Sequence, residues 1–538
     1  MSEPQHKPPQ LSRLSFALIF VGLALALLLA AIDQVIVSSA IPSIGNSFQD
    51  FERVPWIGTA YLLTSSAMAP TYGKLSDIFG RKSVFLVAIV IFEIGSLICG
   101  VATSMDMLIA GRAIAGIGGG GLIGLVLIII SDLVSFQDRG KYQGIIGAVF
   151  GLASIIGPFV GGLFTDKISW RWCFFINLPF GALAILAIVF FLHLPTPEGS
   201  ITAKLQRIDY LGSLVLISAV ICLLLPVQYG GGDWAWNAPQ TIALFVAAAV
   251  LTGLFIFIEF RVAKEPVIPP SIFRHHSVGL ILAFTFLFGA AFLAIVYYLP
   301  TYFQIIDGAT ATQSGVYTIP MVVVFIILNI GSGIVVSRSG HYRIFFWIGF
   351  PFMIGGSALL YVLNEQSLLS TQMLFSLAFG IGSGCIIQSK TIAIQASVPH
   401  SEIAVATTLT NFAQTLGGVL GIAIGGAFLN NTLQSTLQAS SLSPEVITMI
   451  IRSPASIRSV FANDPSALAT TVSAFLVGIR SIFLSTIPYT VVGWFASLII
   501  REFRKGQTAA PKSVSGLDDA ATNKHELNEI VSDREPHN

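Results

Sequence analysis

The sequence predicts an all-α integral membrane protein, and two observations carry that prediction. Of the 538 residues, 54% are apolar and only 10% are charged, well below the roughly 25% charged residues usual in soluble domains. The apolar residues also gather into stretches of about 20, the length that a helix needs to cross a bilayer. A soluble chain could not leave so much apolar surface in contact with water. We therefore expect a bundle of membrane-spanning helices.

Fourteen stretches meet this criterion, and their even number predicts that both termini lie on the same side of the membrane. Residues 1–13 and 501–538 are polar and predict terminal tails. The first apolar run is too long for the core of a cleavable signal peptide. In chain order, the expected spans are 14–41, 54–73, 83–103, 107–130, 142–165, 172–193, 211–229, 240–259, 279–299, 314–336, 344–363, 371–396, 404–429 and 479–500.

Basic residues set the expected orientation. Most loop lysines and arginines, among them Lys74, Lys82 and Arg139, fall on one side of this topology. The positive-inside rule places that side, with both termini, in the cytosol. The long loop 430–478 then lies outside or in a lumen, where Asn430 begins an Asn-X-Thr glycosylation sequence. The membrane is either the plasma membrane or the vacuolar membrane, and an unmodified Asn430 is the alternative.

A faint internal repeat divides the chain into two halves. Residues 333–343 follow the tenth span much as 73–82 follow the second, with glycine and basic residues kept and the aspartate lost. We expect a six-helix bundle at 14–193, two extra helices with linkers at 194–278, and a second six-helix bundle at 279–500. Such parallel halves are typical of transporters that bind their substrate near the bilayer midplane.

The segment 73–82 is a charged turn bounded by glycine, wedged between two spans. It must lie at the membrane surface, because lipid solvates neither its charges nor its open backbone. Asp77 and Arg81 are spaced to meet across one helical turn. We expect a conformational latch formed by Gly73, Asp77, Gly80, Arg81 and Lys82; simple loop solubility is the alternative.

Four charged residues within predicted spans stand out, because charge in a span is costly and usually functional. Asp33 in the first span and Arg112 in the fourth each lie roughly 8–12 Å below the outer surface, at a rise of 1.5 Å per residue. Matched depth predicts that they pair, either to exchange protons or as a structural ion pair. Glu93 is expected to be protonated and bonded within its helix; a second proton site or a substrate contact is the alternative. Lys390 is shallow enough to reach the surface; otherwise it faces the cavity.

Polar residues in the spans of the second half, together with one in the first, are candidates for a substrate cavity. They are Gln34, Gln388, Lys390, Gln395, Asn411 and Gln414. Amides in membrane spans also bond neighbouring helices, which is the alternative for each. In the fifth span, five residues predict close helix approach and a bend: Gly151, Gly157, Pro158, Gly161 and Gly162.

Residues 33–42, the turn 73–82, Arg112 with its following glycines, and the segment 151–162 resemble, in order, four motifs of the fourteen-span drug:proton antiporters of the major facilitator superfamily. The segment 170–179 resembles fungal members in particular. The resemblance implies the major facilitator fold with two inserted helices. It also implies proton coupling at Asp33 and Arg112, gating at Asp77 and Arg81, and antiport from 151–162.

The expected function is therefore proton-driven export of small amphipathic compounds, such as drugs, toxins or secondary metabolites. The chain has no glycine-rich phosphate loop for ATP, no metal-ligand spacing among its four cysteines, and no catalytic constellation. We expect a non-enzymatic monomer with no cofactor and no metal, whose partners are its substrate, protons and lipid. The net charge of +1 argues against nucleic acid. Vacuolar import of basic amino acids and a non-transporting sensor are the alternatives.

Overall fold

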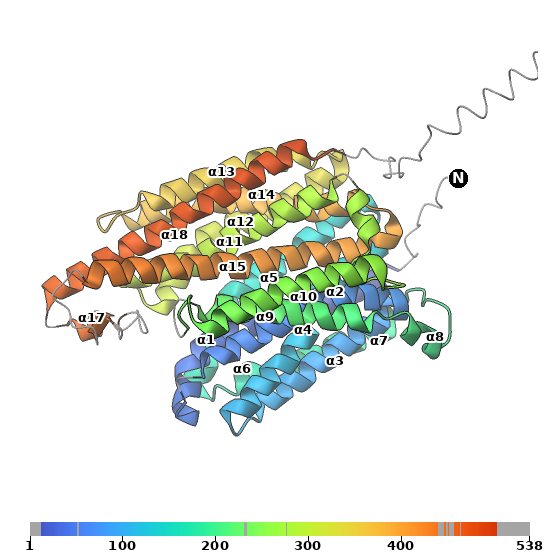
Figure 1. Ribbon diagram of the computed structural model, residues 1–538, viewed down its shortest axis with the longest axis horizontal. Coiled ribbons are helices and arrows are strands. Elements are labelled where there is room, and N and C mark those ends of the chain that lie inside the picture. The colour runs from blue at the N-terminus through green and yellow to red at the C-terminus, as the bar shows by residue number, and fades with distance from the viewer. Residues whose placement is uncertain are drawn as a thin grey trace, which may run out of the picture.

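The computed structural model describes residues 12–50, 53–230, 234–275, 277–438, 446–447, 450, 457–462 and 464–502. These residues form long helices that run side by side along the longest axis of the molecule (Figure 1). Within them, twelve helices are long and apolar enough to cross a membrane. Two further long helices, α2 with 25 residues and α5 with 32, are not among the twelve. The all-α membrane prediction is confirmed, whereas the count of fourteen spans stays a prediction.

The first bundle consists of seven helices, and the last two of them lie within one predicted span, 172–193. They are α1 (Arg13–Phe48), α2 (Pro55–Phe79), α3 (Arg81–Gly100), α4 (Met105–Leu133), α5 (Phe136–Lys167), α6 (Trp172–Phe175) and α7 (Asn177–Phe191). Helix α4 lies between α2 and α3 because its glycines admit their backbones. A Cβ added at Gly116 would overlap Tyr61, and one at Gly118 would overlap Phe92. Small residues allow this close packing where lipid gives helices little reason to associate.

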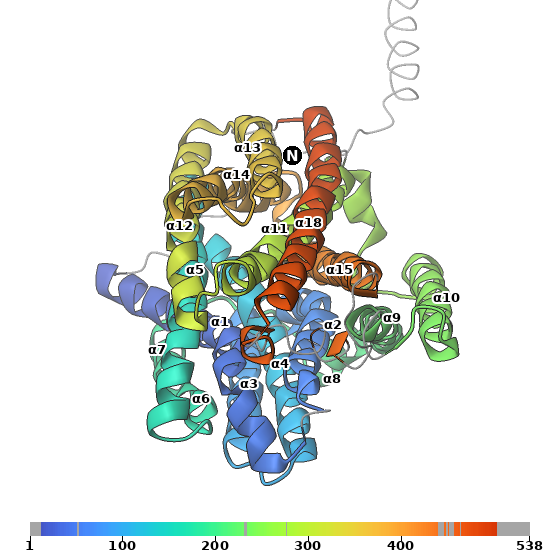
Figure 2. The same ribbon diagram turned by 90° about the vertical axis from the view of Figure 1, so that its left-hand side faces the viewer.

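A linker region with an inserted helix pair follows, and then the second bundle. The linker region holds α8 (Ile201–Gln206), α9 (Tyr210–Tyr229), α10 (Pro239–Arg261) and the short 3-10 helix η1 (Pro270–Arg274). The second bundle holds α11 (Val278–Ile305), α12 (Ala311–Ser339), α13 (Arg343–Tyr361), α14 (Leu369–Ala396), η2 (His400–Glu402), α15 (Ile403–Gln438), α17 (Ile457–Val460) and α18 (Pro465–Ile499). Figure 2 shows the two bundles together, with α9 beside α2 and α15 and with α10 on the outer side of α9.

The bundles meet along two seams, α5 with α12 and α2 with α15. We call the end of the molecule that holds residues 73–82 the turn end. There the backbone N–H of Gly140 donates to Ser337 Oγ at 2.8 Å, and Gln388 Nε2 donates to Gln143 Oε1 at 3.0 Å. A Cβ on Gly140 would overlap the Gly333 backbone. The two bundles are therefore in direct contact at the turn end.

Helices α15 and α18 exceed their predicted spans by more residues than the other helices do. Helix α15 runs to Gln438 and α18 begins at Pro465, so helix occupies both ends of the predicted outer loop 430–478. For α15 the physical reason is core packing: Leu429, Leu433 and Leu437, spaced one turn apart, are all buried in the core of the second bundle. Asp464 caps the first turn of α18.

Candidate functional site

The Asp33–Arg112 pair lies in the interior of the first bundle. Arg112 Nη1 on α4 contacts Asp33 Oδ2 on α1 at 2.5 Å, and the two side chains are 1% and 0% exposed. Their matched depths predicted this contact. Water solvates neither charge, so the charged form of each side chain is stabilised mainly by the other.

Neutral groups from other helices complete the arrangement. Arg112 Nε donates to the Ile57 carbonyl at 2.9 Å, and its guanidinium lies over the Tyr61 ring, 4.4 Å from the centroid. Asn177 Nδ2, on α7, donates to the second Asp33 oxygen at 3.2 Å and to Ser96 Oγ at 3.0 Å. Sequence reasoning did not single out Asn177. Asn177 lies within the segment 170–179, and the resemblance of that segment to fungal transporters was the available signal.

Glu93 lies on α3 and packs against Gly181 of α7. Both of its carboxyl oxygens are buried and have no hydrogen-bond partner within the described part of the chain. The expectation that Glu93 bonds within its own helix is therefore wrong. Its oxygens point at the neighbouring helix, because a glycine at position 181 leaves room for them there.

At the turn end, the segment 73–82 is more helical than predicted. Helix α2 continues to Phe79, and the chain reverses at Gly80 alone, whose φ of +93° favours glycine. Asp77 and Arg81 contact each other at 2.5 Å, and Arg81 Nε also contacts Asp132 of α4 at 3.0 Å. Arg81 thus ties the ends of α2, α3 and α4 together.

The other members of the expected latch make contacts outside this ion pair. Lys82 Nζ donates to the Val189 carbonyl of α7 at 2.7 Å. Gly73 lies on the α2–α15 seam, where an added Cβ would overlap Thr408. In this segment, therefore, the charged residues connect helices of the first bundle to one another, whereas Gly73 contacts the second bundle.

A second group of charges joins this segment to the linker between α10 and α11. Glu265 accepts from Lys74 at 3.0 Å and from Arg207 at 2.6 Å. The hydrogen bond from Arg207 and the Lys74 charge lower the pKa of Glu265 below its ordinary value. Sequence reasoning did not identify Glu265, because its partners Lys74 and Arg207 lie far from it along the chain.

The amides proposed to line a cavity fall into two groups that differ in burial. Gln388 Nε2 of α14 donates to Gln143 of α5 in the other bundle, and Gln395 Nε2 donates to Thr407 Oγ1 of α15 at 3.2 Å. Both are buried and bond neighbouring helices.

The remaining polar candidates are less buried. Gln34, Asn411 and Gln414 are half-buried. Asn411 Nδ2 has no partner in the described chain. Asn411 therefore keeps an amide donor that no other residue of the described chain satisfies, unlike Gln388.

Lys390 is 1% exposed and lies inside the second bundle. The expectation that it reaches the membrane surface is wrong, because depth along a helix does not fix which face a residue occupies. No carboxylate contacts it in the described residues. An amine there can bond an anionic or carbonyl group that enters the bundle.

The glycine-rich segment of α5 contacts two different helices. Gly157 and Gly161 pack on Val35 and Ile36 of α1, whereas Gly151 packs on Ile326 of α12. A Cβ on Gly162 would meet nothing within 4 Å. Helix α5 is unbroken through Pro158, whose side chain lies outside the described residues. Asn430, the predicted glycosylation residue, lies within α15 and is half-buried.

The chain is similar to known proteins. The sequence model of the Major Facilitator Superfamily matches residues 23–422. The "MFS-type efflux pump MFS1" of Trichophyton rubrum is 40% identical over 456 residues, which cover 84% of this chain and 85% of that protein. The chain belongs to the major facilitator superfamily. The "MFS-type transporter phomT" of Diaporthe leptostromiformis is 37% identical over 465 residues, 85% of this chain and 78% of that protein.

Solved structures of the superfamily share the fold. The human organic anion transporter MFSD10 aligns with a TM-score of 0.59 at 15% identity, covering 91% of this chain and 100% of that one. The proton:xylose symporter XylE aligns with a TM-score of 0.55 at 15% identity, covering 92% and 97%. The chain is a membrane transporter of this superfamily and not an enzyme.

Proposed function

We propose that this transporter exports small amphipathic compounds in exchange for protons, and that Asp33 is the residue that takes up the proton. The observation that carries the proposal is the Asp33–Arg112 pair, in which a carboxylate with 0% exposure meets a single cation. The printed names of the fungal relatives, efflux pump and transporter, support export. Substrate classes as broad as drugs, toxins and secondary metabolites fit the same arrangement.

Protonation of Asp33 removes its negative charge and leaves Arg112 without a counterion. The Ile57 carbonyl and the Tyr61 ring remain as neutral partners for the guanidinium. Removing one partner of a buried ion pair costs about 3–5 kcal/mol, so the protonated state favours a rearrangement of α1 against α4. Glu93 is a second candidate proton site, because its buried oxygens have no donor in the described chain.

In the proposed cycle the two bundles move by alternating access, so that the transporter opens to one side of the membrane at a time. Contact between the bundles at Gly140 and Gly333 supports a conformer closed at the turn end. Asp77 and Arg81, with Gly73, Gly80 and Lys82, act as the latch of that conformer. The glycines of α5 provide the surfaces that slide on α1 and α12.

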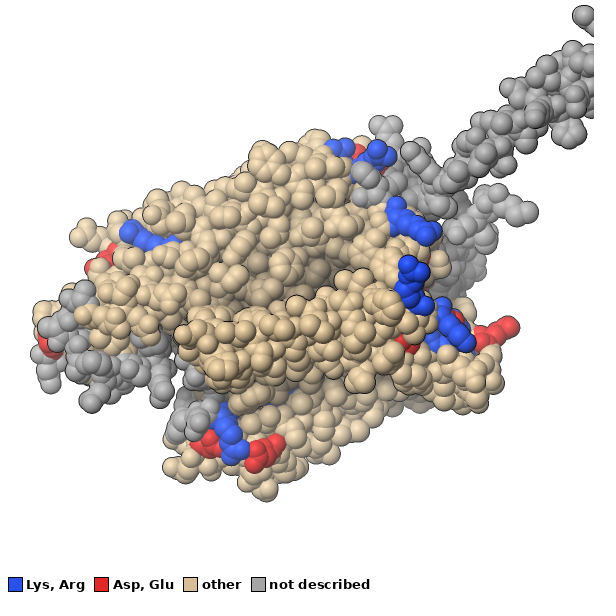
Figure 3. All heavy atoms as spheres, in the orientation of Figure 1, with Lys and Arg blue, Asp and Glu red and all other residues tan. Residues whose placement is uncertain are grey.

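The topology proposed is fourteen spans with the turn end and both termini in the cytosol. Figure 3 supports this orientation, since the lysines and arginines on this face gather mainly at the turn end. The protein acts as a monomer in the plasma or vacuolar membrane, with Asn430 as a glycosylation residue. Gln34, Asn411 and Gln414, with Lys390, are the substrate contacts that we favour over Gln388 and Gln395. A buried, unneutralised Lys390 disfavours the alternative cargo, basic amino acids.

The test is Asp33→Asn in proteoliposomes that hold a pH gradient. We expect loss of cargo-driven proton release and of gradient-driven cargo transport, with normal protein yield. Asp106→Asn is the matched control, because Asp106 also pairs with an arginine but is 78% exposed. Gradient-driven transport by Asp33→Asn at the parent rate would remove Asp33 from the mechanism.

A further inference from the structure

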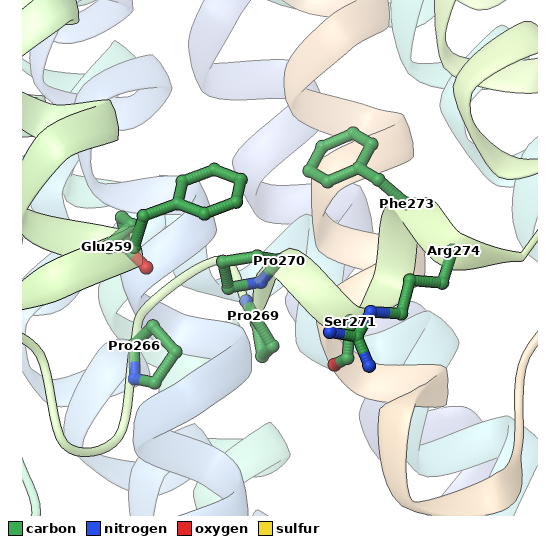
Figure 4. A pocket seen from close by; sticks show the side chains of 8 residues that line it. Glu259, Pro266, Pro269, Pro270, Ser271, Phe273 and Arg274 are labelled. Carbon is green, nitrogen blue, oxygen red and sulfur yellow. The ribbon is translucent and has the colours of Figure 1, made fainter.

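A groove separates the end of α10 from η1, on the turn-end side of the inserted helix pair. Its volume is about 620 Å³, and it is lined by Glu259, Phe260, Pro269, Ser271, Phe273 and Arg274 (Figure 4). We call it the linker groove. None of its residues belongs to the proton-coupling or latch sets described above.

The rim of the linker groove is apolar and exposed. Phe260 and Phe273 are 65% and 52% exposed. Helix α10 continues this surface away from the groove with Val250 and Phe257, which are 64% and 58% exposed. In a membrane-spanning helix, such a face is covered by acyl chains.

The acidic groups near the groove are already bonded to the protein. The Glu259 carboxylate accepts the backbone N–H groups of Val267 and Ile268, each at 3.2 Å. Glu402 accepts from Ser271 Oγ at 2.9 Å and lies 3.3 Å from His275 Nε2. Both Glu259 oxygens are therefore engaged, and Glu402 does not line the groove.

The basic side chains near the groove, by contrast, are not bonded to other groups of the described chain. Arg274 lines the groove and is exposed, and it has no ion-pair or hydrogen-bond partner in the described residues. Arg261 and Lys264, on the segment that leads from α10 to the groove, are also exposed and unpaired in the described chain. The groove thus combines unneutralised positive charge with an apolar rim at one end of the helices.

We propose that the linker groove binds an anionic phospholipid, with its phosphate at Arg274 and its acyl chains along Phe260, Phe273 and α10. Basic pockets between membrane helices bind anionic headgroups in this way. A free phosphate ion would use Arg274 but would leave the two rings uncovered. The inference does not depend on proton coupling, and the leaflet concerned is whichever one meets the turn end.

The experiment is native mass spectrometry of the purified full-length protein with phosphatidylserine or phosphatidylcholine of identical acyl chains. We expect one phosphatidylserine to bind at least fivefold more tightly than phosphatidylcholine. Arg274→Gln should weaken phosphatidylserine binding by about fivefold, the effect of one basic residue near a charged lipid surface. Phe273→Ser should weaken both lipids, because both use the apolar rim.

Arg338→Gln is the matched control, since Arg338 is also an exposed arginine at the end of a helix of the turn end, but lies on α12. It should leave the preference unchanged. Thermal unfolding of Arg274→Gln should match the parent, because Arg274 holds no partner in the described chain. Equal affinity for the two lipids, equal loss in Arg338→Gln, or displacement of phosphatidylserine by millimolar inorganic phosphate would each overturn the proposal.

Discussion

Substitution of Gly140 by alanine should hold the two bundles apart at the turn end. The new Cβ would lie inside contact distance of the Gly333 carbonyl and of Ser337 Oγ. The first of these is backbone and cannot rotate away. Overpacking of this kind costs about 1–3 kcal/mol, and only the conformer closed at the turn end pays it. The ratio of closed to open molecules should therefore fall by about 5-fold to about 150-fold.

Spin labels at Ser83→Cys and Arg338→Cys would measure this change as a distance distribution, in a background without the native cysteines. Both positions are exposed, and they belong to the first and second bundle. Gly140→Ala should add or enlarge a longer-distance population. Gly162→Ala is the control on the same helix, because its Cβ would meet nothing within 4 Å. An unchanged distribution in Gly140→Ala, or the same change in both variants, would refute the reasoning.

Three other substitutions have defined outcomes. Asp77→Asn should lower turnover by about fivefold in vesicle transport assays with little change in KM, because it weakens the latch and touches no substrate; an unchanged turnover contradicts this. Asn177→Leu should destabilise the detergent-solubilised protein by about 1–3 kcal/mol in thermal unfolding, since it leaves an Asp33 oxygen without its donor. Glu265→Gln should speed trypsin cleavage at Lys264, whereas the exposed control Glu198→Gln should not.

The pH dependence of the Lys74–Glu265–Arg207 contact has a definite sign. The pKa of Glu265 is lowered in the folded protein from its ordinary 4.5, so the contact stabilises the linker fully above that value. The stabilisation is lost as pH falls through the lowered pKa. Cleavage at Lys264 by an acid-active protease should therefore increase only below about pH 4.5. Cleavage that rises already between pH 7 and pH 5 would contradict the assignment.

The sequence predicted those features of the fold that depend on position along a helix. Asp33 and Arg112 were paired because their depths match, and Asp77 and Arg81 because one helical turn separates them. Helix ends were harder to predict. Hydropathy falls at the membrane edge, whereas α15 continues beyond it through Leu433.

Features that depend on the direction of a side chain around its helix could not be predicted. Lys390 was expected to reach the surface because only its depth was known, and it is instead 1% exposed. Asn177 and Glu265 were missed for a related reason. Each acts on residues that are distant in sequence, and no local pattern marks such a contact.

The inserted helices make the two seams between the bundles unequal. Helix α9 packs on both α2 and α15, and Leu216 and Leu224 of α9 share one apolar cluster with Leu63 of α2 and Val419 of α15. That seam is covered by α9, whereas no inserted helix packs on α5 or α12 in the described chain. The extra helices therefore add a third partner to one seam and leave the other to the two bundles alone.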